Sequence, residues 1–173
     1  MVTKFLLVDP IIQLVRKIIE VTVADLAAMA PGETNKTLGE ALLTPTRLYQ
    51  KAVSCALATG GVHGIVHVTG GGLIENPPRV YNDDLSLVLD LASNPLPPLF
   101  FWLQTAGNIE THELARTFNC GIGMLFFTAP DSADALLAAL TEGPEPDAWV
   151  AGKLIERDTQ PAVILHNNDS WAS

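Results

Sequence analysis

Three consecutive glycines follow, one residue later, an apolar run, residues 62–68, that has the composition of a β-strand. Glycine has no Cβ and adopts positive φ angles readily, so the N–H groups of Gly70, Gly71 and Gly72 can point into one concavity and bind an anion. A helix that begins near Gly72 would add its first-turn amides and its dipole. No Gly-Lys-Ser/Thr follows, as a Walker loop requires, and the G-x-G-x-x-G spacing of dinucleotide-binding loops is absent. The pattern therefore predicts a glycine loop that contacts a phosphate or ribose phosphate, with a tight strand-to-helix turn that binds nothing as the alternative.

Four side chains beside this loop are further candidates for the site. Thr69 could add a hydroxyl to the bound anion or hydrogen-bond to its own turn. The guanidinium of Arg79 could pair with a phosphate through two hydrogen bonds, or with a nearby carboxylate. Asn76 could touch the substrate, but bracing of the loop is the favoured role. His67 is a weak candidate for a catalytic acid or base near neutral pH, and a buried structural role is favoured for it.

Composition excludes several classes of function. Ten basic against nineteen acidic residues give a formal net charge of −9, which argues against a nucleic-acid surface because such a surface needs a basic face. Cys55 and Cys120 are too few for a disulfide framework, and nothing has zinc-ligand spacing. His63 and His67 share one strand face without a third ligand nearby, so no metal site is predicted. No apolar run approaches the ~20 residues of a membrane span, and Asp9 interrupts the first run too early for a targeting signal, so we expect a soluble, cytoplasmic protein.

The hydrophobic pattern alternates between helical and strand periods along a single domain. A proline after Asp9 and apolar residues at helical spacing predict an amphipathic helix that begins there and continues to about Glu20. Further helices are predicted over residues 38–43, 51–59, 99–107, 108–118 (capped by Asn108) and 133–140 (capped by Asp131 or Ser132), and strands over residues 46–49, 62–68, 85–91, 121–128, 148–156 and 162–166. This order favours an α+β or α/β sandwich in which a mixed β-sheet is flanked by helices.

Several motifs follow one another along the chain, namely Leu14–Glu20, Leu43–Tyr49, His67-x-Thr-Gly-Gly-Gly72, Glu75-Asn76-x-Pro78-Arg79, Trp102–Gly107 and Arg116–Met124. Together they resemble the C-terminal domain of aminoimidazole ribonucleotide (AIR) synthetase, also called phosphoribosylformylglycinamidine cyclo-ligase. The resemblance runs from about residue 11 to about residue 165 and implies a mixed sheet flanked by helices, distantly ferredoxin-like. It divides the chain into an altered N-terminal segment, residues 1–10, one domain over residues 11–166, and a tail, residues 167–173, that we expect to fray.

The resemblance implies a function in purine biosynthesis. The family closes an imidazole ring: ATP, with Mg²⁺, phosphorylates the formamide oxygen of formylglycinamidine ribonucleotide, the amidine nitrogen attacks the activated carbon, and phosphate leaves. Such chemistry requires positioning and stabilisation of phosphate charge. In the family the N-terminal domain carries most nucleotide and metal ligands, and the C-terminal domain contributes the triple-glycine loop to the cleft between the domains.

Two departures from the family limit what this chain is expected to do alone. The chain begins where the family's second domain begins, and Phe5–Pro10 replaces a polar loop of the His-Ser-Asn-Gly type. We therefore expect no turnover by this chain alone and no tight binding of ATP or Mg²⁺, with a separate ATP-binding subunit as its partner. A stand-alone module that binds a ribonucleotide or phosphate, and an inactive remnant, are the alternatives. An exposed apolar patch and a homodimer formed through it are also expected.

Overall fold

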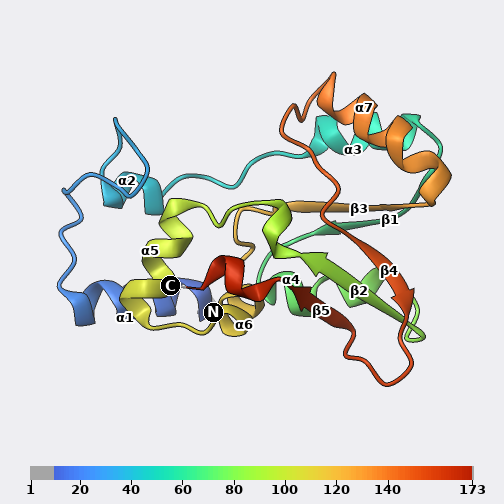
Figure 1. The fold of residues 1–173 in the computed structure, drawn as a ribbon. Helices are drawn as coiled ribbons and strands as arrows, with labels where there is room; N and C mark the ends of the chain where they lie inside the picture. The colour runs from blue at the N-terminus through green and yellow to red at the C-terminus, as the bar shows by residue number, and fades with distance from the viewer. Residues whose placement is uncertain (1–9, 173) are drawn as a thin grey trace, which may run out of the picture.

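The computed structural model describes residues 10–172 (Figure 1). Its first helix, α1 (Pro10–Thr22), confirms the predicted amphipathic helix, and Ile18 on its inner face is buried. The predicted N-cap Asp9 and nearly all of the altered N-terminal segment lie outside the described residues. None of the described helices is long and apolar enough to cross a membrane. The other α-helices are α2 (Leu38–Leu42), α3 (Gln50–Ala58), α4 (Gly72–Glu75), α5 (Pro98–Gly107), α6 (Thr111–Thr117) and α7 (Ala133–Thr141).

The strands of the described region are divided between two sheets, whereas the sequence predicted one. β1 (Val62–His67) and β3 (Met124–Thr128) pair antiparallel in a two-stranded ribbon. The second sheet has the order β4-β2-β5, in which β2 (Leu85–Asp90) runs antiparallel to β4 (Gly152–Glu156) and parallel to β5 (Val163–His166). This sheet is mixed, and helices pack beside both sheets (Figure 1). The predicted α+β class with a mixed, helix-flanked sheet is therefore confirmed.

Two hydrophobic clusters of described residues hold the helices and the two sheets together. The smaller one joins α3 to α7, which lie side by side next to the β1–β3 ribbon (Figure 1). The larger one fills the space between the helices α1, α4, α5 and α6 and the strands. Its most deeply buried side chains include Leu73, Leu89, Leu91, Leu103, Leu114 and Trp171.

The predicted strand over residues 46–49 is not formed. Residues 44–49 have no regular secondary structure and connect α2 to α3 across the top of the molecule (Figure 1). Leu48 in this connection is 89% exposed. Pro45 has no N–H to give to a sheet ladder, and residues 46–49 pair with no strand of the described chain. Residues 46–49 include residue types that favour β-strands, but a strand forms only where a neighbouring strand supplies hydrogen-bond partners.

Backbone conformation changes other predicted boundaries. Asn108 is the C-cap of α5, with φ 48°, and Glu110 occupies the N-cap position of α6. Asparagine tolerates this left-handed conformation better than most residues, which suits it to end a helix. The strand predicted from residue 121 begins only at Met124, because Gly121 has φ 87° and turns the chain. Ser132 occupies the N-cap position of α7, but its side chain makes no capping hydrogen bond.

Residues 167–172 pack against the domain, so the predicted frayed tail is wrong for these residues. A 3₁₀ turn, η4 (Asn168–Trp171), follows β5, and the side chain of Trp171 is only 1% exposed. The indole N–H of Trp171 donates to the carbonyl oxygen of Asn94 at 3.1 Å. The side-chain amide of Asn167 donates to Asp90 Oδ1 at 2.8 Å. A large apolar ring with one satisfied donor gains enough by burial to order a short terminal segment.

Candidate functional site

The glycine loop begins where the β1–β3 ribbon ends. Val68 is buried, and its N–H donates to the carbonyl oxygen of Gly123 at 3.0 Å, which extends the ribbon by one residue. The chain then turns through Thr69, Gly70 and Gly71 into α4. Gly71 has φ 97°, a conformation that favours glycine. The predicted succession of strand, glycine turn and helix is confirmed.

The side chain of Asn76 stabilises this turn by hydrogen bonds to its backbone. Its side chain is only 3% exposed. Its Oδ1 accepts the N–H of Thr69 at 2.7 Å, and its Nδ2 donates to the carbonyl oxygen of Gly70 at 2.9 Å. One buried amide therefore satisfies a donor and an acceptor on adjacent residues. Asn76 braces the loop, which was the favoured role, and it fixes the shape of the turn without a ligand.

Gly72 has a packing role. Its N–H already donates to the carbonyl oxygen of Thr69 at 2.9 Å, and its φ is 55°. A Cβ on Gly72 would overlap the carbonyl oxygen of Ala115 in α6 and lie 2.7 Å from that of Phe118. Gly72 therefore does not fit the predicted anion contact, because its amide is used and its surroundings are closed. α4 has only four residues, so the expected contribution of a helix dipole is small.

Gly70 and Gly71 provide the N–H groups that remain. Within residues 10–172 neither of these N–H groups has a hydrogen-bond acceptor in the protein. Gly70 is exposed, and no atom lies within 4 Å of the place where its Cβ would be. Two adjacent unbonded amides on an open turn, the second in the left-handed conformation, are a typical backbone anion site. Among residues 10–172 the loop therefore keeps two adjacent N–H groups without an acceptor, as a backbone anion site requires.

The three candidate side chains around the loop are all exposed. Thr69 makes no side-chain hydrogen bond to another described residue, so its hydroxyl is available. Arg79, in the 3₁₀ turn η1 (Pro77–Val80), has no ion-pair partner in the described part of the chain, and the local carboxylate partner is not found. His67 is exposed at the end of β1, with its ring centroid 5.7 Å from that of Tyr49. The favoured buried role for His67 is therefore wrong, because its side chain is on the outer face of the ribbon.

Two carboxylates near the loop share one arginine. Arg116 of α6 contacts Glu113 at 2.7 Å and Glu75 of α4 at 3.3 Å. The hydrogen bond from Arg116 lowers the pKa of Glu113. A Cβ on Gly71 would lie 3.0 Å from the Glu75 carboxylate, so this charge is close to the loop. Pairing with Arg116 reduces the repulsion that Glu75 would exert on an anion there.

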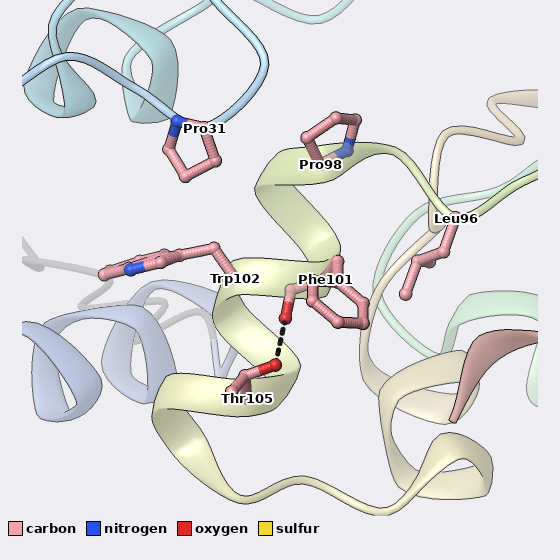
Figure 2. A pocket seen from close by; sticks show the side chains of 6 residues that line it. All are labelled: Pro31, Leu96, Pro98, Phe101, Trp102 and Thr105. Atoms are coloured by element: carbon pink, nitrogen blue, oxygen red, sulfur yellow. Dashed lines mark hydrogen bonds between the residues drawn. The ribbon is translucent and has the colours of Figure 1, made fainter. Parts of the chain in front are cut away.

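Two hollows in the surface lie away from the glycine loop. The first, of about 400 Å³, is an apolar pocket along α5. Figure 2 shows that the Thr105 hydroxyl at its lower end is directed to the carbonyl oxygen of Phe101, to which it donates at 2.9 Å. The pocket is lined by Pro31, Leu96, Pro98, Phe101, Trp102 and Thr105. The second, of about 780 Å³, lies between β3 and β4. Residues 69–79 line neither hollow, and the site predicted from the sequence is a surface turn.

The described residues provide few groups for metal binding or for catalysis by a thiol. No set of three or more His, Cys, Asp or Glu side chains among residues 10–172 is placed to hold a metal ion. Cys55 and Cys120 are free thiols. Burial raises the pKa of Cys120 to about 12, so this thiol is neutral and unreactive at neutral pH.

The sequence of the chain was compared with known families and proteins. The pattern of the family described as "AIR synthase related protein, C-terminal domain" matches residues 11–164. The chain belongs to this family. A relative, the "Bifunctional purine biosynthetic protein purD" of Dictyostelium discoideum, is 43% identical over 148 residues, which are 84% of this chain and 18% of the relative. The AIR synthase-related domain described here therefore spans less than a fifth of that relative and is related to enzymes of purine biosynthesis.

Reasoning from the sequence missed one residue next to the site of this AIR synthase-related domain. Tyr49 packs on Gly123, where any Cβ would meet its hydroxyl, and its ring also contacts that of His67. Burial raises the pKa of Tyr49, which keeps its hydroxyl protonated at neutral pH. The local signal in the sequence was the second glycine of Gly121-Ile-Gly123, because a glycine inside a predicted strand often marks a place where another group approaches the backbone closely.

The two hydrogen bonds of the Asn76 side chain to Thr69 and Gly70, called here the clasp, lead to a prediction for this AIR synthase-related domain. Asn76→Ala should lower the free energy of unfolding by about 2 kcal/mol, because the N–H of Thr69 and the carbonyl of Gly70 lose two part-buried hydrogen bonds to the Asn76 side chain. Chemical denaturation measures the loss. Asn82→Ala is the matched control, since Asn82 is exposed and its side chain makes no hydrogen bond with described residues, and it should change stability by less than about 0.5 kcal/mol. Equal stability of the two variants would mean that water replaces the clasp.

Proposed function

We propose that this chain is the C-terminal half of a purine-biosynthesis cyclo-ligase, which closes formylglycinamidine ribonucleotide to aminoimidazole ribonucleotide in an ATP-dependent reaction. Its contribution is to hold the phosphate of the ribonucleotide with the N–H groups of Gly70 and Gly71. The observation that carries this proposal is the pair of adjacent unbonded amides after β1, one on exposed Gly70 and one on half-buried Gly71, in a member of the AIR synthase-related family.

The neighbouring side chains have consistent roles in this proposal. Arg79 supplies positive charge beside the loop and can bind phosphate oxygens through two hydrogen bonds. Thr69 adds an O–H donor next to Gly70, and the clasp of Asn76 presets the loop so that little conformational entropy is lost on binding. His67 stays a candidate acid or base, since its exposed ring lies near the start of the loop.

ATP and Mg²⁺ belong, in this proposal, to a separate ATP-binding domain or subunit. The described residues do not fit a metal site, and the glycine loop does not have the Walker sequence. This chain therefore acts by position: a substrate held at its phosphate presents its reacting groups to the partner in one orientation. Neither Gly70 nor Gly71 would take part in bond making.

Gly70→Asp should abolish the contribution of the loop. The added carboxylate fits the empty space beside Gly70 without a clash and repels phosphate, so the Kd for ribose 5-phosphate should rise about 100-fold in calorimetric titration. Ring closure in a mixture with an ATP-binding domain of this family should fall by a similar factor at low substrate concentration. Gly70→Ala adds the same Cβ without charge and is the matched control, which should keep most of the binding and the activity.

Two results would count against the proposal in different ways. Ribose 5-phosphate binding that Gly70→Asp leaves unchanged would reject the loop as the phosphate site. Normal binding by the chain but no ring closure in any mixture would reject the cyclo-ligase role and favour a module that only binds ribonucleotides.

A further inference from the structure

A carboxylate lies beside the two free amides of the glycine loop. Glu75 is the last residue of α4, and its N–H donates to the carbonyl oxygen of Gly71 at 2.9 Å. Its Oε2 lies 3.0 Å from the place where a Cβ on Gly71 would be. A site that bound only phosphate would gain nothing from a negative charge so close, since like charges repel. Binding of phosphate alone therefore does not account for Glu75 at this place.

One oxygen of this carboxylate is held by Arg116 of α6. Glu75 Oε1 accepts a hydrogen bond from Arg116 Nη1 at 3.3 Å. The Nε and Nη2 atoms of the same guanidinium donate to the two oxygens of Glu113 at 2.9 and 2.7 Å, which limits its rotation. α4 and α6 are also in direct contact next to Gly72. The Glu75 carboxylate is thereby held with Oε1 toward α6 and Oε2 toward the loop.

The second oxygen has no partner within the described chain. Glu75 Oε2 accepts no hydrogen bond from any of residues 10–172, and the side chain is half exposed. The oxygens of an ionised carboxylate accept hydrogen bonds and do not donate them. A ligand group that contacts Oε2 must therefore carry an O–H or N–H donor, which a fully ionised phosphate does not have.

The two amides of the loop thus have different surroundings. Beside Gly70 no atom lies within 4 Å of the place of its Cβ, so there is room for a bulky anion. Gly71 is half-buried and lies next to the Glu75 carboxylate. This difference favours a phosphate on the Gly70 side and an uncharged donor group on the Glu75 side.

We propose that Glu75 is a specificity residue, whose Oε2 accepts a hydrogen bond from a ribose hydroxyl of the phosphate ester held at the loop. This role rests on the proposed function, because Gly70 and Gly71 must bind the phosphate for the sugar to lie beside Glu75. In ribose 5-phosphate the 3-hydroxyl is on the ring carbon next to the one that bears the phosphate-carrying arm, so it is the nearest candidate. Arg116 is a positioning residue that acts through Glu75.

The carboxylate selects the sugar in two ways. A hydrogen bond to an ionised acceptor is roughly twice as strong as one between neutral groups, so a ligand with the hydroxyl gains affinity. A phosphate ester without the hydroxyl meets only the repulsion of the Glu75 charge and loses affinity. Gain for one ligand and penalty for the other add up in the ratio of the two dissociation constants.

Calorimetric titration of the full chain with ribose 5-phosphate and with methyl phosphate tests this role. Methyl phosphate has the same charged group but no sugar hydroxyl. At about pH 8 both esters are doubly ionised, because the second pKa of a phosphate ester is about 6, so neither phosphate can donate to Glu75. The unaltered protein should bind ribose 5-phosphate on the order of tenfold more tightly than methyl phosphate.

Glu75→Ala should remove this preference. The Kd for ribose 5-phosphate should rise, and the Kd for methyl phosphate should stay the same or fall because a repelling charge is lost, so the ratio should change about tenfold. Glu110→Ala is the matched control. It removes the same charge from an exposed side chain just before α6 that makes no hydrogen bond with described residues, and it should keep the preference.

Glu75→Gln is a second variant that keeps the contact between α4 and α6. Arg116 can only donate, so the amide oxygen of the new side chain must face it, which puts an NH₂ group in the place of Oε2. This group cannot accept a hydrogen bond from the sugar. Glu75→Gln should therefore lose most of the preference while its melting temperature stays close to that of the unaltered protein.

Three results would overturn the role of Glu75, and they separate it from the phosphate site itself. Weakening of both esters by the same factor in Glu75→Ala would mean that Glu75 only braces α4 against α6. Equal binding of both esters by the unaltered protein, abolished by Gly70→Asp, would leave the phosphate site in place and reject recognition of the sugar by Glu75. Binding of neither ester would reject the phosphate site and, with it, the role of Glu75.

Discussion

Gly72→Ala should destabilise the domain by about 3 kcal/mol. A methyl group at this position overlaps the carbonyl oxygen of Ala115 and lies 2.7 Å from that of Phe118, so α4 and α6 must move apart. Forced repacking of this kind costs about 1–3 kcal/mol. The φ of 55° adds about 1 kcal/mol of backbone strain for any residue with a Cβ. For a chain of this length the melting temperature should fall by about 6–12 °C, as measured by calorimetry.

Gly60→Ala separates the two causes. Gly60 also has a positive φ, 75°, but no atom lies within 4 Å of its ideal Cβ position. This variant should therefore lose only the strain of about 1 kcal/mol. Equal losses for Gly60→Ala and Gly72→Ala would contradict the close contact between α4 and α6.

Trp171→Ala should cost about 3–5 kcal/mol, the range for truncation of a large buried side chain. The Trp171 side chain is 1% exposed, and its indole N–H is bonded to Asn94. Its loss leaves a cavity beneath the turn that follows β2 and an unpaired carbonyl oxygen. Equilibrium unfolding in urea, followed by circular dichroism, measures the difference if both proteins unfold in one transition.

Trp171→Phe is the control that separates the contribution of apolar burial to stability from that of the indole hydrogen bond. Phenylalanine keeps much of the apolar area but has no N–H, so this variant should lose clearly less, about 1–2 kcal/mol. A loss below about 0.5 kcal/mol in Trp171→Ala would mean that the terminal turn does not pack in solution. The expected fraying of residues 167–173 would then be correct after all.

Local signals explain what could be predicted about the loop. The strand before Gly70 and the turn at Gly71 follow from apolar composition and from the conformational range of glycine, and both are found. The different roles of the three glycines could not be predicted. Gly72 is constrained by Ala115 and Phe118, which lie far along the chain, and only tertiary packing brings α6 to α4.

The remaining errors have identifiable physical sources. Asn108 was assigned to the start of one helix although it ends the one before, because asparagine suits both positions. One local signal was overlooked: Thr37 and Glu40 have capping-box spacing, and each side chain bonds the other's backbone N–H in α2. The buried Trp171 could not be foreseen from its position near the chain end, since burial depends on contacts with Asn94.

The order of the second sheet has a consequence for biosynthesis. Its middle strand, β2, lies near the centre of the chain, while both of its partners come from the last part, with Val88 opposite Lys153 on one side and Ile164 on the other. A ribosome therefore releases the apolar residues of β2 well before either partner exists. During that interval the nascent chain exposes an unpaired apolar segment that is prone to aggregate, so the domain completes its folding only after residue 166 has left the ribosome.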